Sequence, residues 1–356
     1  MPPLYKILVN KKTYDKARSY LKNLKVGKFE PGSYLYQHLK GMAIARLSTE
    51  EFLETLIRTK KPQIFAESAV CGDGSDWNLK ELSILGDICI AVPVTVYDNG
   101  RHYHPEVHED PFGATLFYVP GALLTNGMGK TPADWDEIIV NGQIDYEKYY
   151  GLYERRLLAP FIYANAVAAS NNKEAFITIP GLGCGQFAGK FRVQLGTLLK
   201  NVLKDFMGKY ANRFSSIRAV YYDPHTECDN ERFEIEGISF FVRPLKKGNE
   251  NKPQLCEPYT YEETRDDFKD CELFSLVAWD HVSWPGNDFY IGIRATDDGV
   301  KAAATNSMAA MTGIEGFYDV STNTYKPPRP HENWNDVVVK NKIELRLKDN
   351  LVVITT

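Results

Sequence analysis

Aspartates cluster in two short segments in the second half of the chain. Asp280 and Asp288 are followed closely by the adjacent pair Asp297 and Asp298. Carboxylates can accept hydrogen bonds from ribose hydroxyls, orient or deprotonate a water molecule, and stabilise an oxocarbenium-like transition state during glycosidic cleavage. They can also collect a Mg²⁺ ion. The cluster therefore indicates a ligand site for sugar chemistry or for a metal.

An irregular loop must carry the first two aspartates. Residues 273–278 are an apolar run typical of a buried strand, and Trp284-Pro-Gly-Asn287 soon after it cannot adopt regular structure. The second pair stands at a helix start, because residues 300–304 are strongly helical. We expect Asp297 to cap that helix. The functional carboxylates are then Asp280, Asp288 and Asp298.

A second candidate site is a glycine-rich turn. Gly181, Gly183, Gly185 and Gly189 lie between the strand-like residues 175–179 and a helix-like run. A strand, a glycine-rich turn and a helix start together bind phosphate, because glycine lets the backbone approach the anion and the first helical N–H groups point at it. A tight turn without a ligand is the alternative.

The spacing of these glycines does not fit the common nucleotide motifs. Neither a dinucleotide fingerprint nor a Walker loop matches, because the acidic partner is missing and Gly189-Lys190 is followed by Phe191. Cys184 inside the turn is a possible nucleophile, although a small apolar residue there more often packs beneath the turn.

Composition excludes several classes of protein. The chain has 356 residues, 44% of them hydrophobic, and a formal net charge of −4, so we expect no nucleic-acid or membrane-surface partner. It contains no apolar run of transmembrane length and no signal peptide, which predicts a cytoplasmic protein. The six cysteines have no C-x-x-C spacing and are expected to be free thiols. His102, His104 and His108 could converge on zinc, but their polar context favours an exposed hairpin loop.

The order of predicted elements favours an α/β fold. We expect a helical appendage over residues 1–65 and one ligand-binding domain over residues 66–356. Predicted strands cover 81–97, 114–119, 175–179, 217–222, 273–278 and parts of 337–355. Predicted helices cover 144–169, 190–211 and 297–312, and residues 224–270 look turn-rich. Such alternation predicts a mostly parallel mixed sheet with helices on both faces and ligands at the carboxyl ends of its strands.

At this point the two candidate sites suggest a family. Residues 177–189 resemble the phosphate-binding loop of macrodomains, which bind ADP-ribose. Residues 273–313 are similar to the other ligand loop of that family, in which an apolar strand runs into an Asn- and Gly-rich loop and an Asp-Gly helix start. In macrodomains the latter segment ordinarily precedes the phosphate loop. Here it follows, which suggests a circularly permuted macrodomain.

The acidic loop is most similar to that of the MavL-type macrodomain effectors. Trp279-Asp280, Gly286-Asn-Asp288 and Ala295-Thr-Asp-Asp298-Gly carry this resemblance, which covers roughly residues 80–320. It implies catalytic roles for Asp280, Asp288 and Asp298. The implied ligand contacts are Gly181, Gly183, Cys184, Gly185, Gln186, Phe187, Ala188, Gly189, Asn287 and Tyr222. The Asn-Ala-Ala-Asn and triple-glycine signatures of ordinary macrodomains are absent, which argues against their mechanism.

The resemblance implies an ADP-ribosylhydrolase that acts on a modified protein side chain, with arginine as the expected linkage and ubiquitin as a candidate protein. It implies no cofactor and no protein-bound metal. A bacterial effector of this kind would work in the host cytosol. Three alternatives stay open: a module that binds ADP-ribose without hydrolysing it, a metal-dependent nucleotide hydrolase or transferase, and a host-interaction protein in which the sheet is only a scaffold.

Overall fold

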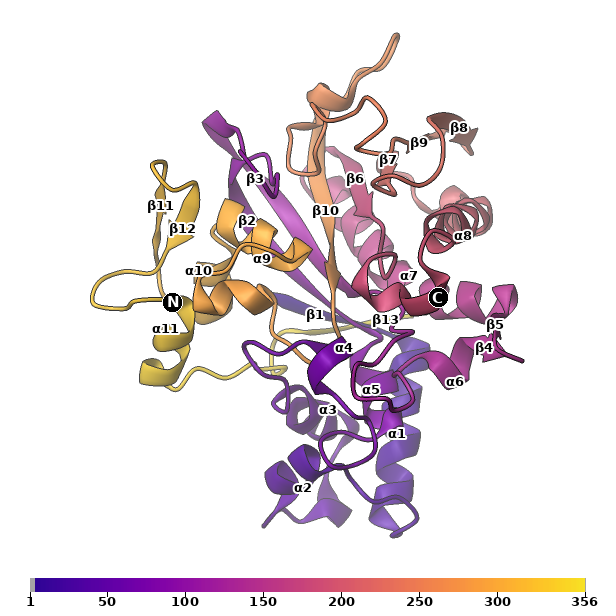
Figure 1. Ribbon diagram of the computed structural model, residues 1–356, viewed down its shortest axis with the longest axis vertical. Coiled ribbons are helices and arrows are strands. Elements are labelled where there is room, and N and C mark those ends of the chain that lie inside the picture. Colours follow the sequence, from indigo (N-terminus) through magenta and orange to yellow (C-terminus); the bar gives the residue numbers. More distant parts are fainter. Residues whose placement is uncertain (1–3, 356) are drawn as a thin grey trace.

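A nine-stranded mixed sheet forms the centre of the protein, in a computed structural model that describes residues 4–355 (Figure 1). Its order is β13-β1-β2-β3-β10-β6-β7-β9-β8. The strands are β1 Lys6–Asn10, β2 Ile88–Asp98, β3 Val107–Pro120, β6 Glu174–Pro180, β7 Ile217–Asp223, β8 Glu231–Ile235, β9 Ile238–Val242, β10 Cys271–Trp279 and β13 Leu351–Ile354. Two small hairpins lie outside it, β4 Ile139–Val140 with β5 Gln143–Ile144 and β11 Phe317–Asp319 with β12 Thr324–Lys326.

The middle of the sheet is parallel. Strands β3, β10, β6, β7 and β9 all run in one direction, whereas β2 and β8 are antiparallel to their neighbours. The carboxyl ends of the five parallel strands therefore meet at one edge. Both candidate loops follow neighbouring strands at this edge, because β6 and β10 are paired. The predicted mostly parallel sheet is confirmed.

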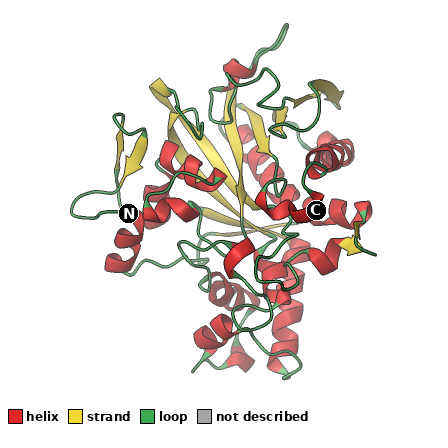
Figure 2. Ribbon diagram, viewed as in Figure 1, coloured by secondary structure: helices red, strands yellow, loops and turns green. Residues whose placement is uncertain are grey.

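Helices cover both faces of the sheet (Figure 2). The α-helices are α1 Lys11–Lys25, α2 Ser33–Leu39, α3 Thr49–Ile57, α4 Ala66–Ala69, α5 Leu79–Leu85, α6 Trp135–Ile138, α7 Tyr146–Ser170, α8 Leu195–Tyr210, α9 Asp297–Ala304, α10 Ser307–Thr312 and α11 Trp334–Asn341. Side chains that alternate along the strands enter two cores: Phe117 belongs to the core that includes residues of α7 and α8, whereas Tyr118 belongs to the core that includes residues of α1, α3 and α9. This alternation is what a sheet buried on both faces requires.

Some elements differ from the sequence-based expectation. Residues 1–65 contain helices, but Lys6–Asn10 form β1 of the central sheet. Leu79–Leu85 is a helix rather than a strand, because Asn78 and Glu81 form a capping box at its start. Trp334–Asn341 is also a helix, since burial of its apolar face overrides the strand preference of its valines. The turn-rich region contains β8 and β9. The domain boundary at residue 65 stays a prediction.

Candidate functional site

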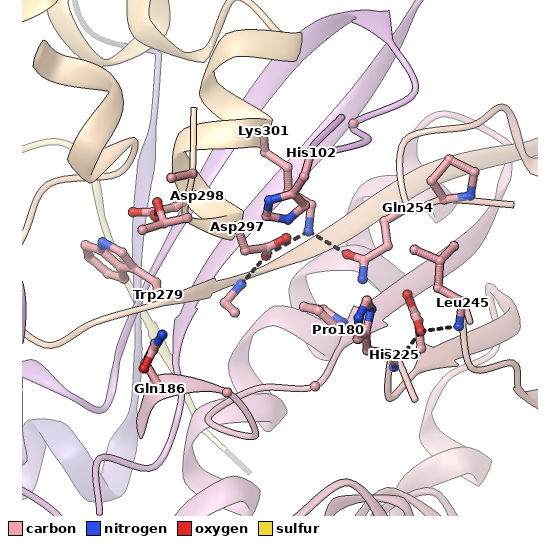
Figure 3. Close-up of a pocket in the computed structure, with 18 of the residues that line it drawn as sticks. His102, Pro180, Gln186, His225, Leu245, Gln254, Trp279, Asp297, Asp298 and Lys301 are labelled. Carbon is pink, nitrogen blue, oxygen red and sulfur yellow. Dashed lines mark hydrogen bonds and ion pairs between the residues drawn. The ribbon is translucent and has the colours of Figure 1, made fainter. Parts of the chain in front are cut away.

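A cavity of about 890 Å³ lies at the carboxyl ends of the parallel strands, between the glycine loop and the acidic loop. Figure 3 shows its two ends: Trp279, Asp298 and Gln186 lie toward one, and His225 and Leu245 toward the other. The cavity is lined by eight of the expected site residues: Gly181, Gly183, Gly185, Gln186, Phe187, Asp280, Asn287 and Asp298. The structure thus brings the two loops together around one space.

The glycine loop reaches the cavity by packing tightly onto the chain after β3. A Cβ on Gly183 would lie 2.7 Å from the backbone nitrogen of Ala122, and its φ of +73° also favours glycine. Gly185 instead faces open space, since a Cβ there would meet no atom within 4 Å. The loop continues as a 3-10 turn over Gln186–Phe191, and the regular helix α8 begins only at Leu195. Backbone rather than side chains therefore borders this part of the cavity.

Four of the expected ligand contacts lie outside the cavity lining. Cys184 donates weakly from Sγ to the carbonyl of Leu182 at 3.6 Å, and burial raises the pKa of its thiol. Tyr222 donates its hydroxyl to the carbonyl of Gly196 at 2.9 Å. Ala188 is in the core, and Gly189 abuts Thr125. These residues support the loop, and the raised pKa disfavours the thiolate that a nucleophilic Cys184 would need.

Asp280 holds the acidic loop in shape. Its Oδ1 accepts the N–H groups of Val282 and Ser283 at 2.7 and 2.6 Å, and its Oδ2 accepts the hydroxyl of Ser283 at 2.6 Å. The amide of Asn287 also donates to Oδ2, at 3.0 Å. Asp280 lines the cavity, but its two oxygens already accept four hydrogen bonds. This explains why an irregular loop containing Pro285 can stay ordered.

Asp288 organises the next segment and does not line the cavity. Its Oδ2 accepts the N–H groups of Ala295 and Thr296, both at 3.0 Å, and its Oδ1 lies 2.6 Å from the hydroxyl of Thr296. The carboxylate packs directly against Gly299. Asp288 therefore fixes the segment that leads into helix α9 and does not itself line the cavity.

Asp298 is the carboxyl that keeps a free oxygen. Its Oδ1 accepts the N–H of Gly299 at 3.1 Å and lies 2.6 Å from Thr296 Oγ1, whereas its buried Oδ2 has no hydrogen-bond partner within residues 4–355. Burial raises the pKa of Asp298, and the negative charges of Asp280 and Asp288 add to the shift. The raised pKa lets this carboxyl hold its proton to a higher pH than an ordinary aspartate does.

The hydroxyl of Thr296 supports a protonated Asp298. It lies 2.6 Å from an oxygen of Asp288 and 2.6 Å from an oxygen of Asp298, while it also accepts the N–H of Gly299 at 3.1 Å. A hydroxyl has one proton and can donate to only one carboxylate. The other short contact needs a proton on the second carboxyl, and the raised pKa assigns that proton to Asp298.

Asp297 is not the helix cap that we expected. Thr296 is the N-cap residue, because its side chain accepts the N–H of Gly299. Asp297 instead accepts the N–H of Ala278 at 2.7 Å and the ammonium of Lys301 at 3.0 Å. The helix begins one residue earlier than expected, at Asp297, so Thr296 occupies the N-cap position. Asp297 ties α9 to β10 at the cavity wall.

Residues 60–64, which form hydrogen bonds with the acidic loop, were not identified from the sequence. The carbonyl of Lys61 accepts the N–H of Trp284 at 2.7 Å, and the carbonyl of Val282 accepts the N–H of Lys61 at 2.9 Å. Lys60 donates to the carbonyl of His281 at 2.7 Å and lies 4.0 Å from the centre of the Trp279 ring. No motif marked this segment, because its hydrogen bonds to the acidic loop join residues 221 to 224 positions apart in sequence.

Further residues line the opposite end of the cavity. Oδ1 of Asp223, at the end of β7, accepts the N–H groups of His225 and Leu245 at 2.7 and 2.8 Å, and burial raises the pKa of this carboxyl (Figure 3). Lys301 donates to the side chain of Gln254 at 2.5 Å. Of the three clustered histidines only His102 lines the cavity, and residues 4–355 contain no group of His, Cys, Asp or Glu side chains that could hold a metal ion.

A mostly parallel sheet with a glycine-rich loop and an acidic loop after neighbouring strands is consistent with a macrodomain fold. The family model of the macrodomain effector MavL matches residues 5–331, and the chain belongs to this family. The match extends beyond the region of the sequence resemblance and includes β1 and α1 to α5. None of the curated proteins compared with the chain matches it. Over residues 4–355 no helix is long and apolar enough to span a membrane.

Proposed function

We propose that the protein is an ADP-ribosylhydrolase that removes ADP-ribose from a modified protein side chain, with arginine as the linkage. Asp298 carries the proposal: it is buried, lines the cavity, and keeps one oxygen free of any partner in residues 4–355. A macrodomain that only bound ADP-ribose would have no use for a carboxyl kept ready to exchange a proton. Ubiquitin is the candidate modified protein.

The two ends of the cavity orient the ligand in this proposal. The diphosphate lies against the backbone of Gly183 to Phe187, in the glycine-rich loop that follows β6. The distal ribose then reaches Asp298, and adenosine occupies the end near Asp223. Asp298 reacts from its ionised form, which the raised pKa makes a stronger base. It orients the attacking water at the anomeric carbon and takes its proton as the new C–O bond forms. The C–N bond to the side chain breaks at the same time, and the leaving guanidine takes up a proton.

Asp280 and Asp288 are positioning residues in this mechanism. Asp280 fixes the loop between β10 and Asp288, and Asp288 holds Thr296, which contacts Asp298 at 2.6 Å. The three aspartates act as one unit, since each negative charge nearby favours the protonated form of Asp298. Substitution of either positioning aspartate is expected to lower turnover without removing the free oxygen itself.

Calorimetric titration with ADP-ribose and a hydrolysis assay on arginine-modified protein test the proposal. Binding at 100 times Kd should raise the free energy of unfolding by about 2.7 kcal/mol. Asp298→Asn should keep binding and lose turnover by about 10²- to 10⁴-fold, the usual contribution of an acid/base group. An Asp298→Asn protein that hydrolyses the substrate at the wild-type rate would contradict the role of Asp298.

A module that binds ADP-ribose without hydrolysis is the second candidate. It is favoured by the hydrogen bonds of Asp280 and Asp288, which commit both carboxylates to loop structure. The wild-type protein distinguishes the two candidates. Binding of ADP-ribose with no turnover on any modified protein, arginine-linked or otherwise, would establish the reader instead of the hydrolase.

A further inference from the structure

The segment between α3 and α5 borders the acidic end of the cavity. Phe65 and Glu67 of this segment line the cavity together with Trp279, Asp280 and Asp298. The segment is fixed before and at Glu67, because the N–H of Ile64 donates to the side chain of Asn287 at 3.0 Å and the N–H of Gly127 donates to the carbonyl of Glu67 at 2.5 Å. Glu67 thus has a defined place in the cavity wall.

Glu67 has no counter-ion. Across residues 4–355 no Lys, Arg or His side chain forms an ion pair with its carboxylate. The nearby lysines are engaged elsewhere: Lys60 donates to the carbonyl of His281, and Lys61 lies 4.3 Å from the centre of the Tyr34 ring. Burial raises the pKa of Glu67, and the charge of Asp280 adds to this shift, so a cation beside Glu67 would favour its carboxylate form.

The other acidic groups at this end are already compensated. Asp280 accepts four hydrogen bonds, and Asp297 pairs with Lys301. Asp298 is buried and favours its neutral form. Glu67 is therefore the carboxylate that an incoming positive group can neutralise. A phosphate would be repelled there, and a ribose hydroxyl would leave most of the charge uncompensated.

We infer that Glu67 binds the cationic side chain to which ADP-ribose is attached and so selects a guanidinium-linked substrate over a neutral linkage; this rests on the proposed function. The distal ribose lies at Asp298 in that proposal, and the group attached to its anomeric carbon extends toward the wall that contains Glu67. A planar guanidinium matches a carboxylate with two parallel hydrogen bonds, and the aromatic Phe65 lines the cavity together with Glu67. Glu67 is thus a specificity-determining residue and takes no part in bond breaking.

Binding to a slow-turnover protein tests this inference. Asp298→Asn and Asp298→Asn with Glu67→Gln are each titrated with free ADP-ribose, an arginine-linked ADP-ribosyl peptide and the matched serine-linked peptide. The first protein should bind the arginine-linked peptide about 10- to 100-fold more tightly than the serine-linked one, as expected for a charge-assisted hydrogen-bonded pair. Glu67→Gln should reduce that preference to about 3-fold or less. The affinity for free ADP-ribose should stay unchanged.

Glu250→Gln in the same background is the matched control. Glu250 also lines the cavity but belongs to the loop after β9, so its substitution removes one negative charge from the other end and should leave the linkage preference intact. A preference for the arginine-linked peptide that survives Glu67→Gln would overturn this inference but leave the proposed function standing. Equal losses for both peptides and for ADP-ribose would also overturn it, since Glu67 would then serve the nucleotide or the fold. Failure of the starting protein to bind ADP-ribose would instead overturn the proposed function.

Discussion

The carboxylate of Asp288 lies so close to Gly299 that no side chain fits between them. A Cβ at position 299 would stand 1.8 Å from Oδ1 of Asp288. Gly299 is in the first turn of α9, directly after Asp298. The glycine therefore allows the loop that carries Asp288 and the helix that carries Asp298 to meet.

Gly299→Ala is expected to displace Asp288 and to disturb Thr296 and Asp298 with it. Overpacking of this kind lowers the free energy of unfolding by about 1–3 kcal/mol. Urea unfolding measures this change, and turnover should fall along with it. Gly208→Ala is the control, because Gly208 lies in α8 and a Cβ there meets no atom within 4 Å. The control should stay neutral or gain up to about 1 kcal/mol. Equal stability of both variants would contradict the packing argument.

Asp298→Asn is expected to change how stability depends on pH. The pKa of Asp298 is raised in the folded state, so the wild type has its full stability below the unfolded pKa, near 4, and loses stability as pH rises through the folded pKa. Asparagine cannot ionise, and its amide can donate to Thr296 Oγ1 as a protonated carboxyl does. The variant should therefore exceed the wild type in urea midpoint at pH 8, with the difference shrinking toward pH 4.5. A variant less stable than the wild type at pH 8 would contradict a raised pKa.

Lys60→Met is expected to weaken the dependence of the free energy of unfolding on pH between about pH 7 and pH 9.5. Burial lowers the pKa of Lys60 from 10.5 to about 7, so the unfolded state binds the proton more tightly and the folded protein loses stability as pH falls across that window. Below about pH 7 this loss is complete. Urea unfolding at pH 7 and pH 9.5 should therefore show a larger gain with pH for the wild type than for Lys60→Met. Lys61→Met serves as the control, and a variant at position 60 that keeps the full wild-type gain would refute the assignment.

Cys184→Ser is expected to leave hydrolysis within about 3-fold of the wild-type rate, because burial holds Cys184 as a neutral thiol below the glycine loop. Alkylation by iodoacetamide at pH 7.5 should be slow at this residue, as mass spectrometry of the modified protein can measure. Complete loss of turnover in a folded Cys184→Ser protein would restore the nucleophile hypothesis.

Local sequence patterns were enough to locate the two ligand loops. Glycines at positions 181, 183 and 185 after an apolar strand, and aspartates after another, can be recognised because strand, turn and helix start are set by neighbouring residues. Parallel pairing of β6 and β10 then brings the loops to one edge. The separate environments of Asp280, Asp288 and Asp298 could not be inferred, since they depend on which N–H groups the folded loop turns toward each carboxylate.

Contacts distant in sequence account for most of what was missed. Glu67 borders the cavity, and Lys60 packs on Trp279, only because residues 60–64 bond to the loop at 281–287. Strand β1 was missed because α1 follows it at Lys11 without a loop, and because its pairing with β13 joins opposite ends of the described chain. Hydrophobic periodicity indicates which face of a helix or strand is buried, and it carries no information about which distant segment pairs with that element.

Pairing of β1 with β13 also determines when the sheet can be finished during synthesis. Ile7 pairs with Leu351, so one edge of β1 has no hydrogen-bonding partner until almost the whole described chain has left the ribosome. Contacts of such sequence separation slow folding, and an unpaired strand edge is a template for association with other chains. Until β13 arrives, the nascent protein exposes the backbone of β1 beside an otherwise complete core. Deletion of Leu351–Ile354 would make that transient exposure permanent and favour aggregation over loss of the cavity.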